Sequence, residues 1–309
     1  MRLESDALSH GIPRPGDPIQ PLIFTHRSGS WDLRERARVV GILNLTPDSF
    51  YDGGWHAAQG SALDRAERMV AEGADGIDVG GQSTRPGGEP VGPEKEWRRI
   101  EPTLSLLRKR VSVPLSIDTY HTSVARRALD LGVDVVNDVS GLMVDPAIAE
   151  EAARAHAGLV IMHSLGAPSD LHAPREYGDV ALDVRDFLER QARAAESRGV
   201  PREKIAVDPG IGFSKRSEQS VAALRGLPLL TLLGRPVYVG LSRKSFLGAI
   251  TGQPAEGRLA AGLGALVAAY ALGARIFRTH DVRETVDALR AAEAALSPAA
   301  APLHQEAGA

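Results

Sequence analysis

The chain has 309 residues, with 36 Lys and Arg against 39 Asp and Glu, which gives a formal net charge of −3. A composition of 43% hydrophobic and 24% charged residues is that of a globular protein, not of a disordered chain. The near-neutral charge argues against a general nucleic-acid binder, and the absence of cysteine excludes disulfides and thiolate metal sites. No stretch is long and apolar enough to cross a membrane. We therefore expect no nucleic-acid or membrane partner and a cytoplasmic location, with which a cysteine-free chain is compatible.

The two ends of the chain differ in composition from its middle. Residues 1–37 begin without a secretory signal and contain Pro13, Pro15, Pro18 and Pro21, so they are predicted to form a partly extended N-terminal arm. Residues 297–309 are rich in alanine, proline and glycine and are predicted to be a flexible tail. The region between them, residues 38–296, is predicted to be one catalytic domain.

Between these ends, short apolar runs alternate with segments of helical spacing. The predicted strands are 39–43, 76–80, 115–118, 134–138, 159–162, 205–208, 237–240 and 275–278. The predicted helices are 61–72, 93–110, 122–131, 146–157, 177–198, 218–224, 259–272 and 282–296, with Ser61 and Asp145 as candidate helix caps. Eight such units in roughly 250 residues predict an α/β fold of the (β/α)8 TIM-barrel type. An open doubly wound sheet is the alternative, which the lack of a glycine-rich nucleotide fingerprint after the first strand weakens.

Polar residues stand at or just after the end of every predicted strand. They are Asn44, Thr46 and Asp48; Gln82, Ser83, Thr84 and Arg85; Asp118; Asn137 and Asp138; His163; Asp208; Ser242, Arg243, Lys244 and Ser245; and Arg278, His280 and Asp281. Any one aspartate after a strand is more often a turn former or a helix cap than a catalyst. Their joint occurrence carries the argument, because the carboxyl ends of barrel strands converge on one mouth.

The polar residues divide into two chemical groups. Asp118, Asn137 and Asp208 combine hydrogen-bond acceptors with an amide, which suits a flat heterocycle with amino and ring N–H groups. A second group is cationic and suits phosphate, and it consists of Arg85, Lys244, Arg278 and His280. Asn44 and the region of Asp48 add oxygen ligands for Mg²⁺, an ion that keeps waters and substrate phosphate oxygens around it.

Nine segments, running in order from about residue 39 to residue 296, resemble the dihydropteroate synthases. They are 41–50, 52–54, 77–81 with 83–87, 116–119, 137–139, 162–163, 208–213, 242–246 and 278–282. Any one of these motifs alone is a weak signal, whereas the ordered set is highly specific. The resemblance implies a TIM-barrel homodimer that joins 6-hydroxymethyl-7,8-dihydropterin pyrophosphate to p-aminobenzoate, giving 7,8-dihydropteroate and pyrophosphate in folate biosynthesis.

The same resemblance implies a role for each matching residue. The pterin is expected to bind Asp118, Asn137, Met162, Asp208, Lys244 and Arg278, and the p-aminobenzoate to bind Thr84, Pro86, Gly212, Phe213 and Ser245. Pyrophosphate is expected at Asn44, Arg85, Arg278 and His280, with Asn44 as the protein's Mg²⁺ ligand. Catalysis is expected to involve Asp48, Asp118, Asp208 and Lys244.

Two other functions share part of this pattern. A methyltetrahydrofolate:corrinoid methyltransferase has a similar Asp/Asn/Asp pterin set, but it does not need the arginine and lysine motifs. A pterin-binding paralogue without synthase activity is expected to lose the pyrophosphate residues, and these are present. Four positions depart from the family pattern: Gln82, Tyr51, His121 and Ser164. The family usually has glutamate at the position of Gln82.

Overall fold

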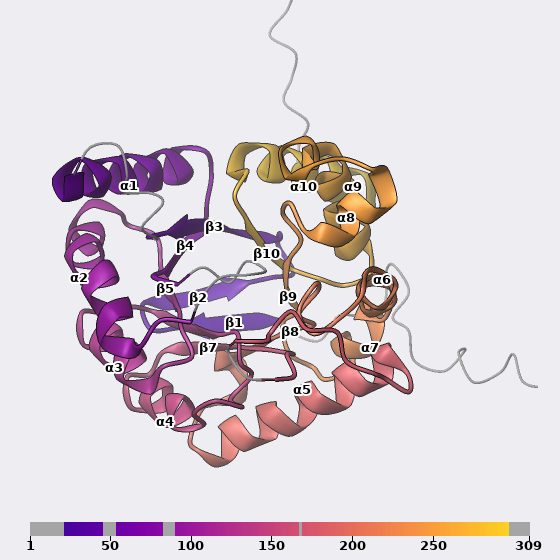
Figure 1. The fold of residues 1–309 in the computed structure, drawn as a ribbon, viewed down its shortest axis with the longest axis horizontal. Coiled ribbons are helices and arrows are strands. Elements are labelled where there is room, and N and C mark those ends of the chain that lie inside the picture. Colours follow the sequence, from indigo (N-terminus) through magenta and orange to yellow (C-terminus); the bar gives the residue numbers. More distant parts are fainter. Residues whose placement is uncertain (1–21, 46–53, 83–89, 167–168, 297–309) are drawn as a thin grey trace, which may run out of the picture.

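The computed structural model describes residues 22–45, 54–82, 90–166 and 169–296. Eight parallel strands form the centre and helices surround them (Figure 1). The strands are β3 (Arg38–Asn44), β4 (Gly76–Gly80), β5 (Leu115–Asp118), β6 (Val135–Asp138), β7 (Gly158–Met162), β8 (Ile205–Asp208), β9 (Tyr238–Gly240) and β10 (Ile276–Thr279). The helices are α1 (Gly54–Ala71), α2 (Pro93–Arg110), α3 (Thr122–Asp130), α4 (Ala147–Arg154), α5 (Val180–Ser197), α6 (Ser217–Arg225), α7 (Leu227–Thr231), α8 (Ser245–Thr251), α9 (Leu259–Ala271) and α10 (Val282–Leu296). Within the described ranges, no helix is both long and apolar enough to span a membrane.

The sheet closes on itself. Its strand order is β8-β7-β6-β5-β4-β3-β10-β9, so β10 joins the last part of the chain to β3, and β8 and β9 are left at the two ends. A parallel bridge between Val207 and Val237, with the Val207 N–H donating to the Pro236 carbonyl at 2.9 Å, connects these two ends. The predicted (β/α)8 barrel is therefore confirmed, and the open doubly wound sheet is wrong.

Most predicted elements lie where the apolar spacing placed them, but two details differ. Helix α1 begins at Gly54, so Ser61 lies inside the helix and its prediction as a cap is wrong. The Asp145 carboxylate does accept a hydrogen bond from the Ala147 N–H at 3.1 Å, as a cap would. Helices α7 and α8 were not predicted, because helices of five and seven residues are too short to show a 3.6-residue period.

Alternation along the strands separates two layers inside the barrel. Val135, Ala206 and Ile276 belong to one buried apolar cluster, and each lies two residues before a polar residue of its strand. Those polar residues are Asn137, Asp208 and Arg278. Because side chains two apart on a strand share a face, the carboxyl ends carry polar groups into the same interior that the amino ends fill with apolar ones.

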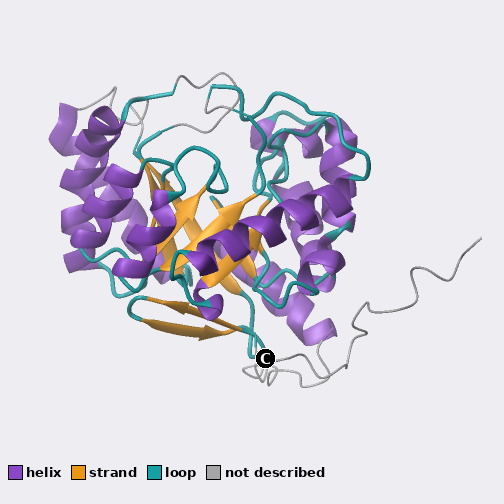
Figure 2. Ribbon diagram, turned by 90° about the horizontal axis from the view of Figure 1, so that it is seen from below, coloured by secondary structure: helices purple, strands orange, loops and turns teal. Residues whose placement is uncertain are grey.

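A β-hairpin covers the amino-terminal end of the barrel (Figure 2). Strands β1 (Ile23–His26) and β2 (Gly29–Asp32) pair in antiparallel register, with Phe24 opposite Trp31. Phe24, Trp31 and Leu33 are buried in the same cluster as Val135, Ala206 and Ile276 of the barrel interior. Residues 22–37, expected as part of a partly extended arm, are thus built into the fold. The expectations for residues 1–21 and for the tail 297–309 fall outside the described residues.

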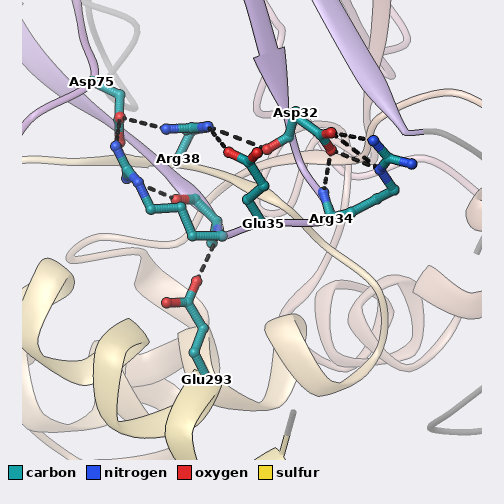
Figure 3. Close-up of polar contacts among 8 residues, drawn as sticks. Asp32, Arg34, Glu35, Arg38, Asp75 and Glu293 are labelled. Atoms are coloured by element: carbon teal, nitrogen blue, oxygen red, sulfur yellow. Dashed lines mark hydrogen bonds and ion pairs between the residues drawn. The ribbon is translucent and has the colours of Figure 1, made fainter. Parts of the chain in front are cut away.

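Ion pairs fasten the segment between hairpin and barrel (Figure 3). Asp75, which precedes β4, pairs with Arg36 and Arg38, and it also accepts the Val39 N–H at 2.9 Å. The Glu293 carboxylate on α10 accepts the Ala37 N–H at 2.6 Å. This end of the barrel is therefore held by contacts from α10 and from the segment before β4, and the opposite end carries the predicted site.

Candidate active site

The site begins as one row of residues across four neighbouring strands, β3, β4, β5 and β6. Asn44 lies beside Gly80, Gly80 beside Asp118, and Asp118 beside Asn137, each pair in register. A Cβ at Gly80 would lie 3.5 Å from Asn44 Oδ1 and 3.7 Å from Asp118 Oδ2. Glycine at this position therefore leaves open the space onto which the Asn44 and Asp118 side chains face.

Arg278 crosses the barrel from β10 to this row. Its Nε donates to Asp78 Oδ2 at 2.6 Å, and its Nη2 donates to Asp118 Oδ2 at 2.8 Å. The Asn137 amide donates to the same Asp78 oxygen at 3.1 Å. Asp78 is fully buried and was not predicted as a site residue. Its signal in the sequence was a carboxylate in the middle of the apolar strand Gly76–Gly80.

Burial and pairing act against each other in this group. Burial raises the pKa of Asp118, the Arg278 guanidinium opposes that shift, and the nearby carboxylate of Asp78 adds to it. Burial lowers the pKa of Arg278, but Asp78 and Asp118 outweigh burial and raise it above its ordinary value. Arg278 is therefore a permanent cation held between two carboxylates, with its remaining N–H donors available to a ligand.

Lys244 and Asp208 are two further ionisable groups of the mouth, and each acts electrostatically on the pKa of the other. Burial raises the pKa of Asp208 to about 6, against the opposing effects of the Gly210 N–H and of Lys244. Burial lowers the pKa of Lys244 to about 8, and Asp208 again opposes the shift. The Asp208 carboxylate accepts the Gly210 N–H at 2.7 Å. Each charge thus favours the ionised form of the other near neutral pH.

An apolar wall stands beside the charges. Met162 and Phe213 are buried in one cluster with Tyr120, Val139 and Leu171, and Met162 is the register neighbour of Asp208. The Lys244 ammonium lies 4.1 Å from the centroid of the Phe213 ring. Gly212 is close to the same lysine, since a Cβ there would be 3.4 Å from Lys244 Cδ. A flat aromatic ligand would therefore meet a thioether, a ring and a cation together.

The remaining described residues of the predicted set lie around this centre. His280 Nδ1 is 3.1 Å from Ser242 Oγ, and Ser245 is exposed at the start of α8. Arg243 points outward and pairs with Asp281 at 2.6 Å, so the adjacent cations Arg243 and Lys244 serve different purposes. Asp138 is a turn former whose carboxylate accepts the N–H groups of Ser140 and Leu142 at 2.8 and 2.7 Å.

Several predicted positions fall outside the described residues: Asp48, Tyr51, Thr84, Arg85 and Pro86. The other three departures from the family pattern contact neighbouring protein groups. The Gln82 amide donates to the Tyr120 hydroxyl at 2.7 Å, His121 Nε2 lies 3.1 Å from the Val91 carbonyl, and the Ser164 hydroxyl donates to the Val139 carbonyl at 2.8 Å.

Known proteins share both sequence and fold with this chain. A family model described as pterin binding enzyme matches residues 40–280. A dihydropteroate synthase of Synechocystis is 43% identical over 94% of this chain and 98% of its own.

Two solved structures agree with these matches. A Clostridium difficile dihydropteroate synthase, solved in the presence of pteroic acid, has a TM-score of 0.81 at 40% identity and covers 86% of this chain and 98% of its own. A Burkholderia cenocepacia dihydropteroate synthase, complexed with 7,8-dihydropteroate, has a TM-score of 0.80 at 43% identity over 89% and 96% of the two chains. The chain therefore belongs to the dihydropteroate synthases, pterin-binding TIM-barrel transferases of folate synthesis.

Proposed function

We propose that the mouth of the barrel condenses 6-hydroxymethyl-7,8-dihydropterin pyrophosphate with p-aminobenzoate, through the residues described above. The carrying observation is that Arg278 is held by Asp78 and Asp118 on one side of the mouth, while the Lys244 ammonium lies over the Phe213 ring and acts electrostatically on the buried carboxylate of Asp208. Such a mouth offers carboxylates to the pterin and cations to the pyrophosphate.

The reaction assigns a use to each charge. The C–O bond between the pterin methylene and the pyrophosphate breaks, and the bonding electrons leave with the pyrophosphate. Arg278 and His280 would stabilise the charge that develops on this leaving group, and Asp118 and Asp208 the cation left on the pterin. The amine of p-aminobenzoate then bonds to the methylene carbon and loses one proton. No nucleophilic side chain is required.

The binding roles follow the same division. Asp118, Asn137 and Asp208 would hydrogen-bond the pterin edge, with Met162 packing on its ring. Phe213, Gly212 and Ser245 would line the p-aminobenzoate pocket beside Lys244. The roles proposed for Asp48, Thr84, Arg85 and Pro86 rest on the matching motifs alone.

Mg²⁺ is proposed as the metal that accompanies the pyrophosphate. Asn44 offers one amide oxygen beside Asp118, a hard ligand of the kind that Mg²⁺ accepts. The described residues contain no cluster of three His, Asp or Glu side chains that would hold the ion alone. When bound, the ion would neutralise pyrophosphate charge. Calorimetric titration with pyrophosphate should show binding that needs Mg²⁺, and Asn44→Ala should weaken it. Equal affinity with and without Mg²⁺ would contradict the proposal.

A homodimer is proposed through the face of α8 and α9. Helix α9 is almost wholly apolar, yet only Leu266 and Ala269 are fully buried among its residues. Ile250 on α8 is 64% exposed, and Leu259 at the start of α9 is exposed too. Sedimentation velocity should give a dimer, and Ile250→Glu should give a monomer. A monomeric wild-type chain would refute this. We also propose that the enzyme works in the cytoplasm.

The two alternatives fit less well. A corrinoid methyltransferase has no need of the Ser-Arg-Lys-Ser segment or of Arg278 and His280, and a paralogue without activity has no need of intact cations. Both Lys244 and Arg278 are kept at the mouth, in contact with Phe213 and with the two carboxylates respectively.

One assay tests the proposal. The pure protein is incubated with the pterin pyrophosphate, labelled p-aminobenzoate and Mg²⁺, and labelled dihydropteroate is measured. We expect product well above the control without enzyme, and a loss of about 100-fold or more in kcat/KM for Lys244→Ala and for Arg278→Ala. No product from the wild-type chain would refute the proposed reaction. Near-wild-type turnover in either variant would refute the role of that residue.

A further inference from the structure

Lys215, a buried lysine in the segment after β8, has no part in the proposed reaction. Its side chain is 5% exposed. Its ammonium has three partners: His163 Nδ1 at 2.8 Å, the Gly210 carbonyl at 3.1 Å and the Phe213 carbonyl at 3.1 Å. These partners use all three N–H donors of the ammonium. Burying an ammonium is costly, so a lysine saturated in this way points to a specific requirement.

The contact to His163 fixes the state of that ring. When Lys215 is an ammonium it can only donate, so His163 Nδ1 then accepts and the neutral ring has its hydrogen on Nε2. Burial and then the charge of Lys215 lower the pKa of His163 to about 2, so the ring is neutral near pH 7. The ring also packs edge-on against Phe187 at 4.8 Å. Since His163 directly follows β7 and Lys215 follows β8, the contact joins the ends of two neighbouring strands.

The two carbonyls belong to a turn that needs external support. Gly210, Gly212 and Ser214 all have positive φ, at 63°, 80° and 54°. A Cβ at Gly210 would lie 1.9 Å from the His163 carbonyl oxygen, so the turn presses directly on the end of β7. The Gly210 carbonyl accepts the Phe213 N–H at 3.0 Å within the turn, and Lys215 adds a side-chain donor to this carbonyl and to that of Phe213.

This turn carries the substrate-facing groups. Asp208 directly precedes it and accepts the Gly210 N–H, and Phe213 lies near its end with its ring against the Lys244 ammonium. Lys215 also acts through charge, because it opposes the effect that burial has on the pKa of Asp208. Lys215 therefore contacts the backbone on which Asp208 and Phe213 stand.

We propose that Lys215 and His163 are a positioning pair, which fixes the turn 209–214 so that Phe213 and Asp208 face the substrates. The inference rests on the proposed function, because the pockets in question are those of its substrates. Lys215 acts through the turn and is not itself a catalytic residue. The loss of the pair should affect the p-aminobenzoate pocket first, since Lys215 holds the carbonyl of Phe213 itself but reaches Asp208 only through the neighbouring Gly210.

The test compares four variants by steady-state kinetics of the full chain with both substrates and Mg²⁺. Lys215→Met should raise the KM for p-aminobenzoate about tenfold or more, with a smaller change in kcat. Lys204→Met is the matched control: Lys204 lies before β8, at the other end of the barrel, and donates to a single carbonyl, that of His156, at 2.9 Å. Its kinetic constants should equal those of the wild type.

A second pair of variants covers the case in which Lys215→Met does not fold. His163→Asn keeps an acceptor for the ammonium, and His163→Leu removes it. Asn should retain nearly the wild-type KM for p-aminobenzoate, whereas Leu should raise it. An active wild-type enzyme with an unchanged KM in folded Lys215→Met, or equal KM values in the two His163 variants, would overturn the positioning role alone. An inactive wild-type chain would overturn the proposed function and this inference with it.

Discussion

Asp78 shows how one side chain organises the mouth of the barrel. A single oxygen of this buried carboxylate accepts hydrogen bonds from Arg278 and from Asn137, which come from opposite sides of the interior. In the chain, Asp78 is 59 positions from Asn137 and 200 positions from Arg278. The three side chains therefore meet only in the folded barrel. Asp78 thereby aims two ligand-binding groups without facing the mouth itself.

Replacing Asp78 with asparagine should therefore impair catalysis. Asparagine keeps the size of the side chain but removes the charge that orients Arg278, and hydrogen bonds to charged groups contribute about 1.5–3 kcal/mol. We expect kcat/KM to fall about tenfold to 100-fold in Asp78→Asn. Asp75→Asn is the control, because Asp75 also pairs with arginines but at the other end of the barrel. Equal kinetics in the two variants would contradict the role given to Asp78.

At the scale of elements, the hairpin β1–β2 closes the end of the barrel that has no catalytic role. Its inward residue Phe24 is 1% exposed and packs so tightly that a Cβ on Gly158 would lie 2.8 Å from Phe24 Cζ. Its neighbour Ile23 faces outward and is 37% exposed. The alternation of one strand therefore provides a buried and an exposed position next to each other.

The hairpin is expected to stabilise the barrel through its buried face. Phe24→Ala should lower the free energy of unfolding by about 3–5 kcal/mol, as for large-to-small changes in cores, and Ile23→Ala by less than about 1 kcal/mol. Urea denaturation followed by circular dichroism measures both. Similar losses in the two variants would show that the hairpin does not fill the barrel end.

At the scale of the whole molecule, buried carboxylates set the dependence of stability on pH. Burial raises the pKa of Glu96 to about 8 and those of Asp138 and Asp208 to about 6, and it raises that of Asp118 as well. A raised pKa in the folded state means that the folded protein holds protons that the unfolded chain releases. The stability from these groups is complete below about pH 4 and is lost as the pH rises through 6 to 8.

Buried bases act in the opposite direction. Burial lowers the pKa values of His26 and His163, and it lowers that of Lys215 to about 7. The unfolded chain binds these protons more readily, so each base contributes stability that is lost as the pH falls. Lys244, whose pKa burial lowers to about 8, joins these bases, but it titrates mostly above pH 7.5. The four carboxylates therefore outweigh the bases between about pH 5.5 and 7.5.

The protein should therefore be more stable at pH 5.5 than at pH 7.5. Urea denaturation at the two pH values measures the difference. Glu96→Gln should reduce it, because that variant has no carboxylate to titrate at this buried position. A chain that is more stable at pH 7.5 would contradict this balance.

The order of strands and helices followed from the sequence alone. Apolar runs of four or five residues, separated by helices with a 3.6-residue period, were sufficient to predict eight units and a barrel. The sequence also predicted that four residues meet at one mouth of the barrel, because the carboxyl ends of all barrel strands lie at the same end. These residues are Asp118, Asn137, Asp208 and Arg278. Local pattern and chain order carry this information.

Only the tertiary structure decided which groups pair. The contact between Asp78 and Arg278 crosses the barrel, and the contact between Lys215 and His163 joins two strand ends. No periodicity in the sequence predicts either contact. The hairpin was not predicted for a related reason. The apolar side chains within residues 22–33 are buried only because they pack against the end of the barrel. Which side chains are buried, and which of them contact each other, depends on how distant segments pack together. That packing brings positive and negative side chains of a chain with near-neutral net charge together at one site.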